Sequence, residues 1–209
     1  GKAASVMVAG DAARIAAGTY NETVVPTNSG TSVTKHISYL ADKTREYVGA
    51  GGPVILDGQN TLCYAFDLTA GQDFLIIDGF EAVNYKECAI GDAAYYFNGA
   101  STNNIYRNLI SHNVGRDGFV VAGTNNVLEN CLGYNIGDDG MEIKASGNTI
   151  RNCTFTKTGQ VTGASGYALE SNTGYANLYE NNIFDGGIGP SVSNFALSTF
   201  YNNDWFPGS

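Results

Sequence analysis

The segment NVLENC at residues 126–131 returns along the chain with the same order of residue types. Its copies read NIYRNL at 104–109, NTIRNC at 148–153 and NLYENN at 177–182, so the first three copies follow at equal intervals and the fourth after a longer one. Relatives of the same segment occur earlier, as FLIIDG at 74–79, and later, as TFYNN at 199–203. Repeats of about 22 residues indicate a solenoid, in which each repeat packs only against its neighbours.

A second short motif lies about a dozen residues ahead of each copy. In it large apolar residues alternate with mixed ones, which is the period of a strand with one buried face. Its members read YAFD at 64–67, YYFN at 95–98, FVVA at 119–122, MEIK at 141–144, YALE at 167–170 and FALS at 195–198. With no helical stripe between these strands, the sequence predicts an all-β, single-stranded parallel β-helix of about seven coils. It forms one domain over residues 1–209, with an irregular early coil and loop at 27–53.

The composition limits the classes of function. The chain has 209 residues, 43% of them hydrophobic, which is enough for a core, and a formal net charge of −9. Phosphate neutralisation needs clustered Lys and Arg, so this charge speaks against a nucleic-acid partner. No apolar run approaches the roughly 20 residues that span a bilayer, which argues against membrane insertion. The acidic surface, poor in lysine, favours an extracellular location.

Residues at equivalent repeat positions should stack in columns from coil to coil. One column is expected to form an inward amide ladder, and it contains Asp78, Asn108, Asn130, Asn152, Asn181 and Asn202. The glycosylation sequon at Asn152 is therefore expected to be buried, whereas a second sequon begins at Asn21. The preceding column alternates in charge through Arg107, Glu129, Arg151 and Glu180.

The four cysteines leave the disulfide pattern open. Cys131 and Cys153 share a column, and stacked free thiols and a disulfide are equally compatible with parallel strands about 4.8 Å apart. Cys63 and Cys88 do not occupy matching positions, so the repeat makes no prediction about whether they pair.

Acidic residues gather in two copies of one turn. GRDGF at 115–119 and GDDGM at 137–141 are one repeat apart, which places Asp117 beside Asp139 and Arg116 beside Asp138. Glu142 should point outward from the strand that follows, and Glu170 from the next coil. Such carboxylates repel one another unless a cation lies among them, and Ca²⁺ accepts 6–8 oxygen ligands. Asp-Gly is also a common turn pair, so a purely structural role for these residues remains open.

Two resemblances give these patterns a family context. The Asn- and Gly-rich coils, with the opening GDAARIAAGTYNE at 10–22, resemble right-handed parallel β-helix proteins of the pectate-lyase type from about residue 8 to 206. The segment DDGME at 138–142, with Asp117 one coil earlier, is similar to the calcium site of polysaccharide lyase family nine. That resemblance implies Ca²⁺ held by Asp117, Asp138, Asp139 and Glu142, where Glu142 replaces the family's usual Asp. In that family the ion binds the uronate and acidifies its C5 proton, so the resemblance implies the same chemistry here.

The same resemblance implies a lysine base on the following coil, and this chain departs from it there. The aligned position is Ala168, so Lys144 is the nearby substitute as the base, and Arg116 could neutralise a substrate carboxylate. The first hypothesis is thus a secreted protein that acts on or binds acidic polysaccharide, with Ca²⁺-dependent β-elimination at a uronate as its enzymatic form.

The second hypothesis is a non-catalytic structural or adhesive extracellular protein, or a filament subunit. The sequence shows no amphipathic N-terminal capping helix, and open solenoid ends would favour self-association because unpaired strand edges bind like edges. Outward aromatic residues could then contact either sugar rings or neighbouring subunits. The candidates are Tyr96, Tyr134, Tyr175 and Trp205.

Overall fold

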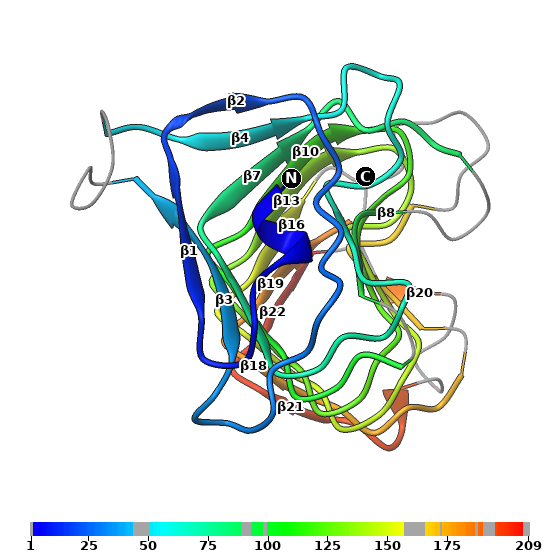
Figure 1. The fold of residues 1–209 in the computed structure, drawn as a ribbon. Helices are drawn as coiled ribbons and strands as arrows, with labels where there is room; N and C mark the ends of the chain where they lie inside the picture. Colours follow the sequence, from blue (N-terminus) through cyan, green and yellow to red (C-terminus); the bar gives the residue numbers. More distant parts are fainter. Residues whose placement is uncertain are drawn as a thin grey trace.

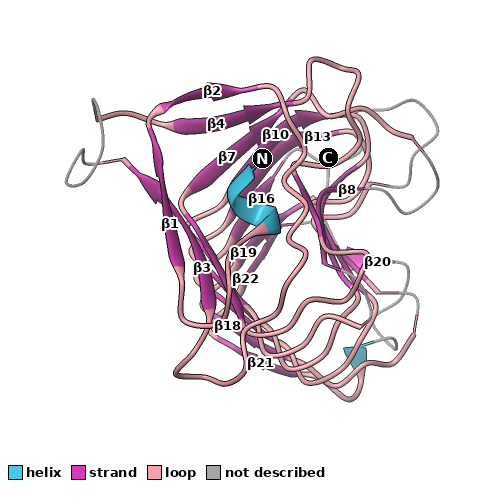
Figure 2. Ribbon diagram, viewed as in Figure 1, coloured by secondary structure: helices cyan, strands magenta, loops and turns pink. Residues whose placement is uncertain are grey.

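The computed structural model describes residues 2–43, 51–88, 93–97, 100–156, 166–171, 173–186, 188–189 and 195–206. Within them the chain winds through three parallel sheets in turn (Figures 1 and 2), and the strands of each sheet pair in parallel. Sheets A and B have eight strands each and sheet C has six, which corresponds to about six complete turns. The predicted all-β parallel solenoid is confirmed, with a turn count slightly below the expected seven.

The bounds of the strands follow the three sheets. Sheet A consists of β1 (Ala12–Ala16), β3 (Ile37–Asp42), β6 (Leu75–Asp78), β9 (Ile105–Arg107), β12 (Val127–Glu129), β15 (Thr149–Arg151), β18 (Leu178–Glu180) and β21 (Thr199–Tyr201). Sheet B consists of β2 (Gly18–Tyr20), β4 (Val54–Asp57), β7 (Phe80–Val83), β10 (Ile110–Val114), β13 (Leu132–Ile136), β16 (Thr154–Thr156), β19 (Ile183–Asp185) and β22 (Asp204–Phe206). Sheet C consists of β5 (Phe66–Asp67), β8 (Ala93–Phe97), β11 (Asp117–Val121), β14 (Met141–Ile143), β17 (Leu169–Glu170) and β20 (Ile188–Gly189).

The core lies inside the solenoid, where equivalent side chains stack from coil to coil. In sheet C the register aligns Phe66, Tyr95, Phe119, Met141 and Leu169, all of them fully buried. The rings of Tyr95 and Phe119 stack with centroids 5.0 Å apart. Each of these side chains is removed from water by contact with the equivalent side chains of the preceding and following coils. This burial of apolar surface stabilises the packing of each coil against the next.

A short 3₁₀ helix covers the N-terminal end of the solenoid. It spans Lys2–Ser5 and lies across the mouth of the core in Figure 1. Ala4 and Met7 are buried there, and the Ala4 carbonyl accepts a hydrogen bond of 3.1 Å from the Thr27 N–H. The expectation of an uncapped N-terminal end is therefore wrong, because one turn of helix is too short to leave an amphipathic signature in the sequence.

The stretch 27–53, in which the repeat is weakest, contains β3. This strand pairs in register with both β1 and β6, so the early coil joins sheet A in the regular way. Residues 44–50 lie outside the described part of the chain.

The predicted column is linked between some coils, since the Asn108 amide donates to Asp78 at 2.7 Å and the Asn130 amide to Asn108 at 3.4 Å, but the buried amide ladder runs through a different column. The predicted asparagines have φ near +50° and lie exposed at the corner after sheet A, where the left-handed conformation favours asparagine. The buried ladder lies at the corner before sheet A: the backbone N–H of each asparagine donates to the side-chain oxygen of the next, at 2.8–2.9 Å. Its members are Asn104, Asn126, Asn148 and Asn177. Asn152, expected to be buried with its column, is consequently exposed, as is Asn21.

The charged column forms contacts between coils, and the four cysteines divide into one disulfide and two free thiols. Arg151 pairs with Glu129 at 2.5 Å, as the alternation of sign predicted, whereas Arg107 pairs with Asp78 at 2.8 Å and not with Glu129. Cys131 and Cys153 are both free and buried, while the unpredicted disulfide joins Cys63 to Cys88.

Among the residues described here, no helix has both the length and the apolar character needed to cross a membrane.

Candidate metal centre

The acidic cluster lies at the start of two neighbouring strands of sheet C. Asp117 is the first residue of β11, and Asp138 and Asp139 form the turn that leads into β14. Gly118 follows Asp117 because this position faces inward: a Cβ there would lie 2.7 Å from the carbonyl oxygen of Gly140. The glycine of this Asp-Gly pair thus lets adjacent coils approach closely.

The three aspartates converge as the repeat predicted. One carboxylate oxygen from each of Asp117, Asp138 and Asp139 lies within 4.8 Å of the others. Oxygen ligands of Ca²⁺ stand about 2.3–2.6 Å from the ion, so two ligands on opposite sides are separated by up to about 5 Å. The spacing therefore fits one calcium ion.

The same carboxylates also hold the turns together. Asp117 accepts the Asp139 N–H at 3.1 Å, Asp139 accepts the Tyr167 N–H at 2.7 Å, and Asp138 accepts the Gly166 N–H at 3.2 Å. In each case Oδ1 is the acceptor, so these backbone bonds leave the second oxygen of every carboxylate to other partners. The structural role is thus present, and it is compatible with a cation.

Burial makes ionised carboxylates costly here. It raises the pKa of Asp117 from 3.8 to about 8, and the negative charges of Glu142 and Asp138 act in the same direction. Burial also raises the pKa of Asp139 from 3.8 to about 10, assisted by a hydrogen bond with Glu170. Without a cation, both groups hold a proton at neutral pH. A divalent ion in place of the protons would compensate the two charges, and the donor set is of the hard oxygen type that Ca²⁺ prefers.

Arg116 borders the cluster as predicted but is engaged by two acids. Its Nη1 lies 2.9 Å from Glu87 Oε1 and its Nη2 lies 3.2 Å from Asp138 Oδ2. Its Nε is buried and makes no hydrogen bond within the described residues. Arg116 therefore adds a positive charge beside the acids. Its two terminal nitrogen atoms are already paired with carboxylates of the protein.

Glu142 and Lys144 form a pair of their own. Glu142 lies on the outward side of β14, as strand alternation requires, yet it is only 6% exposed. Its Oε2 lies 2.6 Å from the Nζ of Lys144. Glu142 lies outside the set of three converging aspartates found among the described residues. Ala168, at the position where the resemblance places a base, belongs to the buried core, so no side chain there could point outward.

The repeat pattern did not predict several residues that lie next to the acidic cluster. Glu87 and Arg116, which form an ion pair, are farther apart in the sequence than one regular repeat, and the cysteines of the disulfide also depart from that period. Cys63, Arg116 and Asp117 nevertheless lie around one crevice that is too narrow to hold a water molecule. Unequal loop lengths hide these neighbours from a search at fixed spacing.

The outward aromatic residues differ in exposure. Tyr134 is 36% exposed and stacks on His112, with ring centroids 4.7 Å apart. Trp205 is 38% exposed and stacks on Phe184. Tyr175 is partly buried against the core, and Tyr96 is half-buried next to Tyr64.

Comparison with known proteins places the fold in a family. No curated protein matches the sequence. A solved structure titled "Rhamnogalacturonan lyase" matches with a TM-score of 0.60 and 18% sequence identity, over 85% of this chain and 61% of that one. The likeness concerns the fold, and the chain spans about three fifths of the length of that protein. The family described as "Right handed beta helix region" matches residues 55–205. The chain therefore belongs to the right-handed β-helix family.

Proposed function

We propose that this protein binds an acidic polysaccharide beside the turns that lead into β11 and β14, through a calcium ion held by Asp117, Asp138 and Asp139. The observation that carries the proposal is the convergence of their carboxylate oxygens within 4.8 Å. Its context is a solenoid whose fold is like that of a protein titled as a lyase of a polysaccharide. Three carboxylates cannot fill the 6–8 positions around Ca²⁺, so carboxylate oxygens of a uronate could complete them.

The protein's own residues prepare the site for an anionic ligand. Arg116 carries a positive charge at the edge of the cluster, and one of its carboxylate partners, Glu87, is exposed. Exchange of Glu87 for a sugar carboxylate would keep the charge pairing while the ligand binds. A bound calcium ion would supply the remaining attraction by coordinating the same sugar acid. Without the ion Asp117 and Asp139 are protonated and offer no positive charge to a sugar carboxylate, so we expect binding to depend on calcium.

The disulfide supports an extracellular setting for this function. Disulfides such as Cys63–Cys88 form and persist in oxidising compartments and are rare in the cytosol. Acidic polysaccharides of cell walls and matrices occur in the same setting. We therefore propose that the protein acts outside the cytoplasm.

A second candidate function is β-elimination at a uronate. It is favoured by the position of Lys144, whose side chain is 35% exposed and adjoins Glu142 beside the cluster. In that reaction the C5 proton passes to the base, the C5–H electron pair forms the C4–C5 double bond, and the C4–O4 bond breaks with its electron pair leaving on O4, which takes up a proton from water. Lys144 would have to be the base, yet an ammonium paired with a carboxylate has no lone pair to accept a proton. The geometry therefore supports binding better than elimination.

The experiment measures both candidates in one set of samples. Affinity for polygalacturonate and alginate is measured with calcium and with chelator, for the wild type and for Asp138→Asn. Asp185→Asn is the matched control, because Asp185 is exposed on β19 of sheet B. We expect binding only with calcium, its loss in Asp138→Asn, and no effect in the control. Equal binding with and without calcium, or no binding to any uronate polymer, would overturn the proposal. Absorbance of unsaturated uronate in the same samples would reveal elimination.

A further inference from the structure

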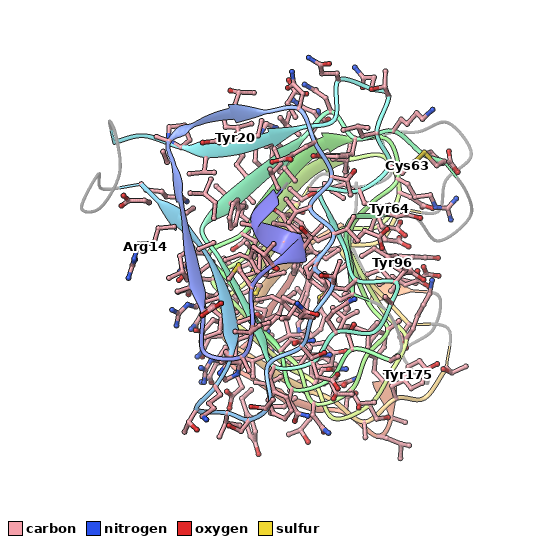
Figure 3. The ribbon with its side chains drawn as sticks, viewed as in Figure 1. Arg14, Tyr20, Cys63, Tyr64, Tyr96 and Tyr175 are labelled. Carbon is pink, nitrogen blue, oxygen red and sulfur yellow. A yellow bond between two sulfur atoms is a disulfide. The ribbon has the colours of Figure 1, made fainter. Side chains whose placement is uncertain are left out.

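An open hollow lies on the outer side of sheet A, where the first coils turn toward sheet B. Its volume is about 580 Å³, which is within the size range of small-molecule sites in proteins. The chain has 11 lysines and arginines, and three of them, Arg14, Lys43 and Arg107, line this hollow. Figure 3 shows Arg14 pointing away from β1 on the outside of the solenoid. A protein with a formal net charge of −9 thus gathers positive charge here, on a different sheet from the acidic cluster.

The register of sheet A sets the order of the lining residues. Arg14 pairs with Leu40, and Leu40 pairs with Asp78 in the next coil. Asp78 in turn pairs with Arg107, so these four residues stand in one outward column with strand spacings of about 4.8 Å. Leu40 is half-buried, and it offers an apolar patch between the charged residues of the column.

The acids of the lining are largely engaged by the protein. Asp78 Oδ2 lies 2.8 Å from Arg107 Nε, and Asp78 Oδ1 accepts the Asn108 amide at 2.7 Å. Asp42, the other acid of the hollow, is only 5% exposed. The Arg107 side chain is 39% exposed, and its Nη1 and Nη2 make no ion pair among the residues that the structure describes. One edge of this guanidinium is therefore available to a ligand.

Lys43 reaches the same part of the hollow from the turn after β3. A Cβ at Gly79 would lie 3.4 Å from Lys43 Cε, so the lysine side chain passes over this glycine. Asn108 occupies the equivalent position in the next coil, and Gly79, with φ +90°, keeps the left-handed turn without a side chain that would crowd the lysine. Lys43 is exposed and makes no ion pair within the described part of the chain. Its ammonium and the open edge of Arg107 therefore border the hollow on either side of Asp78.

We propose that this hollow binds a sulfate or phosphate monoester, with the tetrahedral group held by Lys43 and Arg107. Such a group presents three oxygens, and charge-assisted hydrogen bonds from an ammonium and a guanidinium are strong. The Asn108 amide gives one N–H to Asp78 and has a second for the third oxygen. The organic part of the ester then lies along Leu40 toward Arg14. The site needs no calcium and is independent of the proposed function.

The test is calorimetric titration at low ionic strength in chelator, so that the acidic cluster contains no calcium. The probes are galactose 6-sulfate, glucose 6-phosphate, the inorganic ions sulfate and phosphate, and galacturonate as a carboxylate. Lys43→Gln and Arg107→Gln are compared with the wild type. Arg151→Gln is the matched control, because Arg151 stands in the same column and pairs with Glu129, yet lies outside the hollow.

We expect saturable binding of the esters to the wild type, ~3–10-fold weaker binding in each of the two variants, and no change in the control. The inorganic ions should bind more weakly than the esters because they do not contact Leu40, and galacturonate should bind more weakly still. Thermal unfolding shows that each variant is folded, and Lys43→Gln breaks no ion pair of the described residues, so it serves even if Arg107→Gln is unstable.

Several results would overturn this inference. They are the absence of ester binding to the wild type, unchanged binding in folded Lys43→Gln, and an equal loss in Arg151→Gln, which would show only the general effect of removing a charge. Galacturonate or the inorganic ions binding as tightly as the esters would also overturn the assignment to a monoester. None of these results bears on the calcium site, which is tested with calcium and uronate polymers.

Discussion

Replacement of Asp139 by asparagine tests the electrostatics of the cluster most sharply. Asp139 is 3% exposed, and burial raises the pKa of its carboxyl from 3.8 to about 10. Asparagine has the same shape and keeps an oxygen for the Tyr167 N–H, so Asp139→Asn removes the titration and preserves the turn. A change in pH dependence would then report the carboxyl itself.

The expected magnitude follows from proton linkage. In chelator, the unfolded chain releases the Asp139 proton as the pH passes 3.8, whereas the folded chain holds it until about pH 10. The unfolded state therefore binds fewer protons in this window, and stability falls as the pH rises, by about 1.4 kcal/mol per pH unit for each such carboxyl. At pH 7 the cost is at most about 4 kcal/mol for Asp139. Recovery of about 2 kcal/mol in Asp139→Asn would raise Tm by about 4–8 °C.

The assay is thermal unfolding between pH 5 and 8, with chelator and with calcium. For the wild type we expect stability to fall with rising pH in chelator and to be restored by calcium, because the ion replaces the protons. We expect Asp139→Asn to be more stable in chelator, to depend less on pH and to gain less from calcium. The control Asp185→Asn should follow the wild type. Wild-type stability that is flat or rising between pH 5 and 8 in chelator would refute the reasoning.

Three further predictions concern the solenoid itself. Asn126→Ala removes a buried amide that accepts one backbone N–H and donates to one carbonyl, and should cost about 2–4 kcal/mol in urea unfolding; a loss below about 0.5 kcal/mol would count against the buried ladder. Cys131 and Cys153 should resist a thiol reagent in the folded protein and react together in denaturant, so rapid labelling without denaturant would contradict their burial. Gly118→Ala should destabilise by about 1–3 kcal/mol, because its Cβ would meet the Gly140 carbonyl oxygen at 2.7 Å, and an unchanged Tm would contradict that close approach.

The fold was predictable because each coil of a solenoid corresponds to one repeat of the sequence, so the spacing of equivalent residues gives the length of a coil. The equal spacing of residues 104–109, 126–131 and 148–153 corresponds to the observed register of β9, β12 and β15. The same spacing placed Asp117 beside Asp139 and gave the ion pair of Arg151 with Glu129. Residues that repeat at one interval must stack, since parallel coils offer no other register.

The features that the sequence did not reveal lie at the turns between the sheets of the solenoid. A column of asparagines can lie inside, bonding to buried backbone, or outside, occupying the left-handed conformation, and both roles favour the same residue. The inward assignment of Asn152 and its column failed for this reason. The disulfide Cys63–Cys88 and the contact of Glu87 with Arg116 cross coils of unequal length, so a fixed period could not find them.

Calorimetric titration with calcium tests the central claim most directly. If Asp117, Asp138 and Asp139 hold the ion, the wild type binds one Ca²⁺ and releases protons as Asp117 and Asp139 ionise. The proton release is measured by repeating the titration in buffers of different ionisation enthalpy, and Asp138→Asn should abolish or greatly weaken the binding. Saturable binding with proton release, lost in that variant, is the result we predict. No binding at millimolar calcium, or binding that survives Asp138→Asn unchanged, would contradict the account.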